Sequence, residues 1–148
     1  MSNGIKVKKR NGRGTESLNL DKIHVMVEEA TEGLAGVSAS QVEIQSGIQF
    51  YDGITTAEIQ EILIKSASDL IDLEHPNYQF VAARLLLFAV RKGIYGKMRE
   101  LPHLEQHILN CCNQDVYDKD IFTKYSKEEI DRANSYIDHK RDFLFTYA

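Results

Sequence analysis

Hydrophobic and polar residues alternate at the start of the chain. Ile5 and Val7 are separated by Lys6 and followed by Lys8, which is the two-residue period of a strand with one buried face. An Asn-Gly pair at positions 11 and 12 then breaks the alternation, and such a pair supplies the positive φ angles of tight hairpin turns. The pattern predicts a short β-hairpin with a slightly extended loop.

From Asp21 onward the apolar residues follow helical spacing. Asp21 is expected to cap a first helix that ends at Gly33 or Gly36. Ser38 or Ser40 opens a second, shorter helix. The stripe that predicts the first helix consists of Ile23, Met26, Val27, Ala30 and Leu34.

Two longer helices follow. Thr55 and Glu58 have the spacing of a capping box, and apolar residues at helical intervals continue to Ile71. Pro76 suits the first turn of a fourth helix, which Gly93 and Gly96 end. Because "AARLLLFAV" is apolar on nearly all sides, this helix is expected at the centre of a bundle.

The composition changes at "GKMRELPH", which predicts a domain boundary. We expect one domain over residues 1–96 and a helical extension over residues 97–148. In the extension, "HLEQHILNCC" predicts a helix, "NQDVYDKDIF" a linker, and Ser126 with Glu129 a capped helix. The fold class is therefore mainly α, a helical bundle capped by a short hairpin and followed by helices.

Charge is distributed unevenly over the 148 residues, whose net charge is -4. Residues 1–25 hold six Lys or Arg against two Asp or Glu, whereas the rest holds twelve against twenty. A local cluster of this kind argues against a nucleic-acid partner, which usually needs a whole basic face. No apolar run approaches the roughly 18 residues of a membrane span, and no signal peptide is visible. The chain is expected in the cytoplasm, with no membrane partner and with Cys111 and Cys112 reduced.

The basic hairpin has two interpretations. Five cations could meet at one end of the bundle, and three or four of them match the charge of a triphosphate. They are Lys9, Arg10, Lys22, Arg91 and Lys92. In the alternative, the lysines only protect an exposed strand edge from pairing with another chain. Under the first interpretation the base edge would face Glu16 and Asn19, and its faces would pack against Val7, Ile23 and Ile59.

Other chemistry finds little support. The sequence has no P-loop and no dinucleotide fingerprint. His103 and His107 stand four residues apart, but no third ligand is apparent, so no metal site is expected. No catalytic arrangement of Ser, His, Asp or Cys can be defended from spacing.

The segment "VKKRNGRGTESLNLDKI" resembles the opening of an ATP-cone domain. "FYDGITTAEIQEILIKSASDLI", "PNYQFVAARLLLFAVRKGIYG" and "SYIDHKRDFLFTYA" resemble successive segments of the N-terminal region of the large subunit of class I ribonucleotide reductase. The resemblance implies a regulatory domain that binds ATP as activator or dATP as inhibitor, together with magnesium. It also implies two partners, the catalytic barrel of the large subunit and the radical-generating small subunit.

Site residues can be carried over by position. The resemblance places Lys9, Arg10 and Lys92 at the phosphates with Lys22 nearby, and Thr56 at the start of its helix beside the base and sugar. Gln60 stands where relatives inhibited by dATP have His, and the hairpin is one residue longer than usual. The residues placed around the base and sugar are Val7, Glu16, Asn19, Ile23 and Ile59.

The same resemblance limits the chain's activity. The catalytic cysteines of the family lie beyond this region, and Cys111 and Cys112 match none of them. The chain is therefore not expected to reduce a ribonucleotide alone. The alternative to an effector-binding domain is a degenerate cone that serves only as an assembly piece of a split or truncated large subunit. A DNA-binding repressor is disfavoured because the Cys-x-x-Cys pairs of the zinc-ribbon family are missing.

Overall fold

The computed structural model describes residues 4–147. The described chain divides into two compact units, the first formed by residues 4–90 and 142–147 and the second by residues 91–141. The chain therefore leaves the first unit after Val90 and returns to it at Asp142. The predicted boundary near residue 96 stays a prediction.

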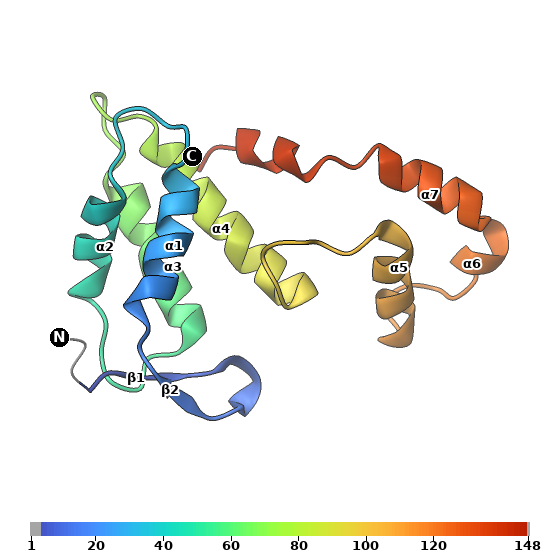
Figure 1. Ribbon diagram of the computed structural model, residues 1–148, viewed down its shortest axis with the longest axis horizontal. Helices are drawn as coiled ribbons and strands as arrows, with labels where there is room; N and C mark the ends of the chain where they lie inside the picture. Colours follow the sequence, from blue (N-terminus) through green and yellow to red (C-terminus); the bar gives the residue numbers. More distant parts are fainter. Residues whose placement is uncertain (1–3, 148) are drawn as a thin grey trace. The chain divides into compact units, whose positions relative to one another are not determined.

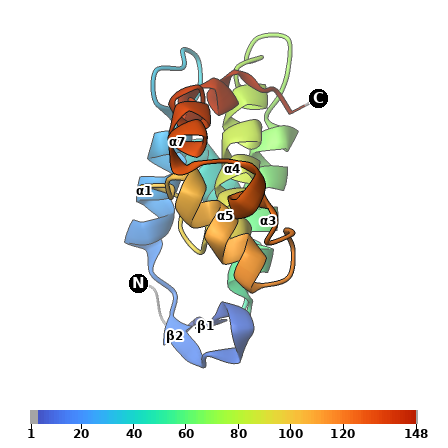
Figure 2. The same cartoon turned by 90° about the vertical axis from the view of Figure 1, so that its right-hand side faces the viewer.

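A two-stranded hairpin and four helices build the first unit. Strands β1 (Lys6–Lys8) and β2 (Thr15–Ser17) pair antiparallel, with Val7 opposite Glu16. A 3-10 turn, η1 (Arg10–Gly12), joins them. In Figures 1 and 2 the hairpin lies at one end of the helical bundle. The helices are α1 (Leu20–Thr31), α2 (Ala39–Gly47), α3 (Thr56–Asp69) and α4 (Tyr78–Tyr95).

Helix α1 begins two residues earlier than a cap at Asp21 would allow. Asn19 is the N-cap, and its Oδ1 accepts the backbone N–H of Lys22 at 3.1 Å. The prediction of Asp21 as the cap is therefore wrong. Asp21 lies in the first helical turn, where its negative charge interacts favourably with the helix dipole.

The core of the first unit lies between the four helices. Val27 and Ala30 of α1, Leu63 of α3 and Val81 of α4 have no exposed surface. Ile54, in the turn before α3, is also fully buried and ties the hairpin end to this core. The four helical side chains come from stretches in which the sequence shows helical spacing. The helices and the two-stranded hairpin together confirm the mainly α fold that the sequence predicts.

The second unit contains shorter helices. They are α5 (Leu104–Asn113), α6 (Ile121–Lys124) and α7 (Lys127–Ser135), followed by a 3-10 segment, η2 (His139–Leu144), that leads back to the first unit. The predicted linker "NQDVYDKDIF" thus ends in the first turn of α6. A small cluster of Ile108, Cys112 and Ile130 forms the core of the second unit.

Two further findings concern the whole of the described chain. Cys111 and Cys112 are both free thiols, as expected. Within residues 4–147, no helix has the length and apolar character that crossing a membrane requires.

Candidate nucleotide site

The base of the hairpin is fixed to the turn that precedes α3. The backbone N–H of Lys8 donates to the carbonyl of Ile54 at 2.8 Å, and the N–H of Gly53 donates to the carbonyl of Lys6 at 2.8 Å. The N–H of Lys6 donates to Asp52 Oδ1 at 2.7 Å. Strand β1 is therefore paired on both edges, so its backbone is satisfied by the protein and its lysines are not needed to shield an open edge.

The backbone conformation of Gly53 allows this pairing. Its φ of +85° lies in the region that residues with a Cβ rarely adopt. A Cβ at this position would lie 3.9 Å from Lys8 Cε, which is ordinary contact, so backbone conformation rather than space requires glycine here.

Arg10 joins the tip of the hairpin to α3. Arg10 Nη2 donates to Gln60 Oε1 at 2.6 Å, and the bond is partly buried. Because the amide of Gln60 is neutral, this bond orients the guanidinium and leaves its positive charge in place. The sequence selected both residues for the site but could not show that they bond to each other.

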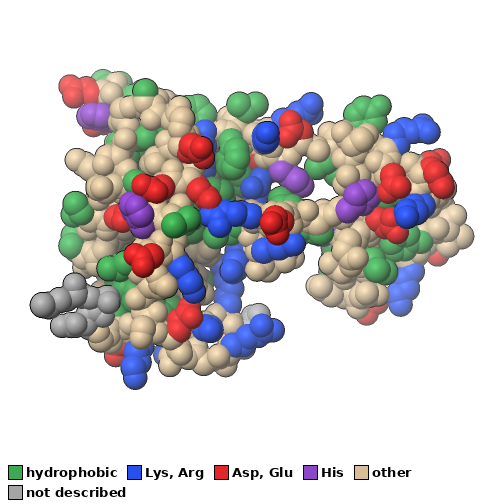
Figure 3. Space-filling model, in the orientation of Figure 1, with side chains coloured by type: hydrophobic (Ala, Val, Ile, Leu, Met, Phe, Trp, Pro, Cys, Tyr) green, Lys and Arg blue, Asp and Glu red, His purple; other side chains and the backbone are tan. Residues whose placement is uncertain are grey.

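Lys9 stands beside Arg10 and pairs across the hairpin. Its Nζ lies 3.3 Å from Glu16 Oε2, and the two side chains are 44% and 37% exposed. Exposed pairs of this kind contribute about 0–1 kcal/mol, so a polyanion could replace Glu16 at little cost. Figure 3 shows Lys and Arg side chains gathered at the hairpin end of the first unit, with acidic side chains among them.

The first turn of α1 supplies a second part of the site. Lys22 is exposed there, and Asn19 uses its side-chain oxygen to cap the helix. An Asn19 amide engaged in this way can still offer its N–H₂ group as a donor. Both residues thus lie at the N-terminus of α1, where the unpaired N–H groups favour negative charge.

The apolar residues predicted to pack against a base are all buried. Val7, Ile23 and Ile59 are 3%, 8% and 6% exposed. Side chains as buried as these offer a base little accessible surface. Their role at a nucleotide therefore stays a prediction.

The start of α3 is rigidly held. Thr56 is its first residue, and Thr55 and Glu58 form the predicted capping box, with Thr55 Oγ1 accepting the Glu58 N–H at 3.1 Å. Tyr51 Oη also donates to Glu58 Oε1 at 2.8 Å. The hydrogen bonds from Thr55, its backbone N–H first, and from Tyr51 lower the pKa of the Glu58 carboxyl. Sequence reasoning missed the Tyr51 contact, because a tyrosine before a cap has no fixed partner.

Lys92 lies apart from the others along the chain. It is exposed in the last turn of α4, in the portion of that helix assigned to the second unit. Its contribution to the site stays a prediction.

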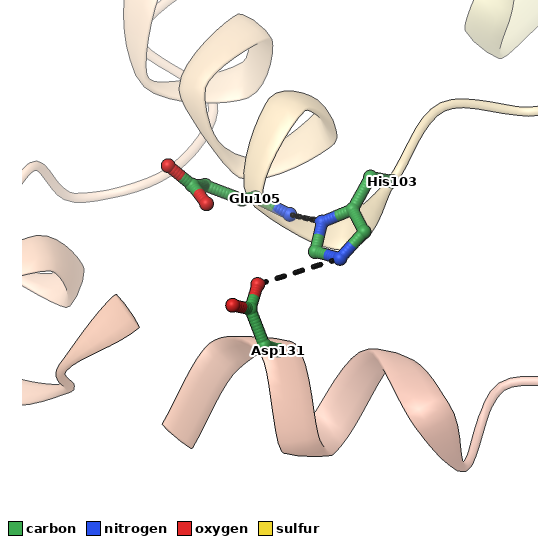
Figure 4. A group of neighbouring side chains, drawn as sticks. All are labelled: His103, Glu105 and Asp131. Carbon is green, nitrogen blue, oxygen red and sulfur yellow. Dashed lines mark hydrogen bonds and ion pairs between the residues drawn. The ribbon is translucent and has the colours of Figure 1, made fainter. Parts of the chain in front are cut away.

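A separate group of side chains lies in the second unit. Ligand atoms of His103, Glu105 and Asp131 fall within 4.8 Å of one another. As Figure 4 shows, His103 Nδ1 accepts the backbone N–H of Glu105 at 3.1 Å, and its Nε2 lies 3.4 Å from Asp131 Oδ1. His103 thus caps α5 through Nδ1 and contacts Asp131 through Nε2, so both of its ring nitrogens have partners within the protein.

Comparison with known proteins identifies the family. The family described as the ATP cone domain matches residues 5–93, which include the hairpin and nearly all of the four helices of the bundle. The chain belongs to the ATP-cone family.

Similarity extends over the whole chain to alpha subunits of a reductase. The chain is 47% identical over 148 residues to "Ribonucleoside-diphosphate reductase 1 subunit alpha" of Escherichia coli (strain K12), and it spans 19% of that protein. The corresponding subunit of Haemophilus influenzae is 45% identical over the same length. That of Enterobacteria phage T4 is 41% identical over 136 residues, which is 90% of this chain and 18% of the phage protein.

These comparisons confirm the resemblance seen in the sequence. They support a regulatory N-terminal region of a reductase alpha subunit. The chain spans about a fifth of the length of the relatives that it matches.

Proposed function

We propose that this chain is the effector-binding part of a ribonucleoside-diphosphate reductase large subunit and that it binds ATP or dATP, with magnesium, at the hairpin. The observation that carries the proposal is the pair Lys9 and Arg10 at the hairpin tip. Arg10 is held by a neutral amide and Lys9 by an exposed carboxylate, so both cations remain available to a triphosphate.

The partners follow from the same proposal. The relatives are about five times as long as this chain, and the remainder of such a subunit is the first partner. Leu144 and Phe145 are 76% and 71% exposed and offer it an apolar contact. The radical-generating small subunit is the second partner. A location in the cytoplasm stays a prediction.

Calorimetric titration with ATP and, separately, dATP in magnesium buffer tests the nucleotide site. We expect Lys9→Ala/Arg10→Ala to weaken binding by about 100-fold, because two hydrogen bonds to charged groups are lost. Lys65→Ala/Lys127→Ala changes the net charge equally at exposed positions outside the hairpin, and we expect it to bind as the wild type does.

A second candidate function follows because the residues of the site already have partners within the protein or are buried. Both cations have protein partners, and Val7, Ile23 and Ile59 are already buried, as expected of a cone that no longer binds nucleotide and only helps to complete its subunit. No heat from a folded chain with either nucleotide would favour this assembly role and overturn the effector site.

A further inference from the structure

The segment after the second unit folds back onto the bundle. Residues 142–147, here called the return segment, belong to the first unit although 51 residues of the second unit precede them. The backbone N–H of Tyr147 donates to the carbonyl of Gln79 in α4 at 3.0 Å. The Phe143 ring meets that of Phe88 edge to face, with centroids 6.2 Å apart. These contacts place the return segment along α4.

One guanidinium joins the return segment to α1. Arg84 of α4 lies 5.2 Å from the centre of the Phe143 ring. Its Nη1 also donates to the carbonyls of Ala30 and Glu32, at 3.3 and 2.9 Å. These two carbonyls belong to the C-terminal end of α1. Arg84 thus links three parts of the first unit that are distant in sequence.

Helix α1 connects Arg84 with the proposed nucleotide site. Its first turn contains Lys22 and Ile23, and its last carbonyls are those that Arg84 binds. Twelve helical residues span about 18 Å, and a helix whose inner face is fully buried at Val27 and Ala30 moves as one piece. A shift of its first turn therefore reaches Arg84.

One donor of Arg84 is unsatisfied in this arrangement of the described residues. Its Nε is buried and has no hydrogen-bond partner among the described residues. A buried donor without an acceptor costs free energy, so an arrangement that gives Nε a partner would recover part of this cost. Leu144 and Phe145 of the return segment are 76% and 71% exposed, and segments with exposed side chains open at lower cost than a buried core.

We propose that Arg84 couples nucleotide binding at the hairpin to docking of the return segment on α4. The proposal rests on the proposed effector site. Docking orders the end of α1, so nucleotide binding to a docked chain loses less conformational entropy. The coupling is reciprocal: ATP favours the docked segment, and the docked segment favours ATP.

Affinity gives the first test. We expect Phe143→Ala to weaken ATP binding to the 148-residue chain about 5-fold or more in calorimetry, the lower range of typical coupling. Phe145→Ala is the matched control, because this ring belongs to the same segment but is 71% exposed, and its affinity should equal that of the wild type.

Fluorescence gives a second readout. It would not depend on Arg84 if this residue only stabilised the fold. The chain has no Trp, so Phe143→Trp introduces a single indole reporter. We expect saturating ATP to shift the emission of this indole to shorter wavelength, and Arg84→Met to abolish the response. If Arg84→Met fails to fold by circular dichroism, Arg84→Lys takes its place, since it keeps the charge but loses the planar guanidinium that lies over the Phe143 ring.

The outcomes separate the two proposals. If the wild type binds no nucleotide, the effector site and the coupling both fail. If the wild type binds ATP but Phe143→Ala binds equally well, or the indole reporter responds to ATP without Arg84, the coupling fails and the effector site stands.

Discussion

At the scale of single residues, the charge on Arg10 decides what the hairpin tip can bind. Gln60 accepts one N–H of the guanidinium, so the remaining donors and the full positive charge of Arg10 stay available to another group. A carboxylate at position 60 would hold Arg10 more strongly and also neutralise it. The identity of this one side chain therefore controls how much positive charge the hairpin tip presents.

Gln60→Glu tests this role. We expect ATP to bind about 10-fold or more weakly, because the nucleotide must displace a charge-assisted bond. Gln60→Ala removes the neutral partner without adding charge and is the control, with a smaller loss. Calorimetry at one ionic strength measures both, and equal affinities for the two variants would contradict the argument.

His24 provides a pH-dependent contact between α1 and α2. Its Nδ1 lies 2.8 Å from Glu43 Oε1, and this hydrogen bond, with the charges of Glu43 and Glu28, raises the pKa of the imidazole above 6.5. A raised pKa means that the stabilisation is fully present below pH 6.5 and is lost as the pH rises through the folded-state value.

Thermal unfolding measured between about pH 5.5 and 8.5 reports the loss of stability that accompanies deprotonation of His24. We expect Glu43→Gln to remove part of the loss of stability above pH 6.5, whereas Glu74→Gln, at an exposed position, should keep the wild-type profile. Parallel profiles for the wild type and Glu43→Gln would show that His24 does not contribute.

At the scale of elements, the helix starts show how far sequence reasoning reached. The capping boxes at Thr55 and Ser126 were predicted correctly, because each consists of two residues three positions apart. The start of α1 was predicted two residues late, since Asn19 and Asp21 are both good caps and only backbone conformation distinguishes them. A single turn such as α6 is too short to show periodicity.

The contacts of the site were harder to predict than its residues. Arg10 and Gln60 are 50 positions apart, and the Arg84 nitrogen that binds Ala30 is 54 positions away from it. No spacing rule applies over such separations, because tertiary packing brings the partners together. Sequence analysis could therefore name Arg10 and Gln60 separately and missed Arg84 altogether.

The cap of α3 predicts acid sensitivity near the hairpin. Hydrogen bonds from Thr55 and Tyr51 lower the pKa of Glu58 below 4.5, so its stabilisation is present above pH 4.5 and is lost as the pH falls through the folded-state value. We expect Glu58→Gln to be less stable than the wild type at about pH 7 and to lose less stability on acidification. Glu61→Gln on the same helix is the control, and an unchanged acid profile in Glu58→Gln would rule out this origin.

At the scale of the whole molecule, the two units have cores of very different size. The second unit has a small core of Ile108, Cys112 and Ile130, whereas the first buries residues from all four of its helices. Small cores leave little margin of stability. The units are therefore expected to differ in how easily they open.

Ile130→Ala tests this difference. Removing a buried Ile side chain costs about 2–5 kcal/mol, comparable with the whole stability of a small unit. We expect hydrogen exchange to speed up throughout α5 and α7 while α1 and α3 keep their protection. Uniformly faster exchange in both units would show that they unfold together.

The return of the chain to the first unit also has a consequence for synthesis. Phe88 packs against Phe143, which leaves the ribosome 55 residues later. At about 5–20 residues per second, Phe88 waits roughly 3 to 11 s for its partner. During that interval the nascent bundle presents an uncovered aromatic edge, at which a chaperone or a neighbouring nascent chain can bind before the protein closes it with its own residue.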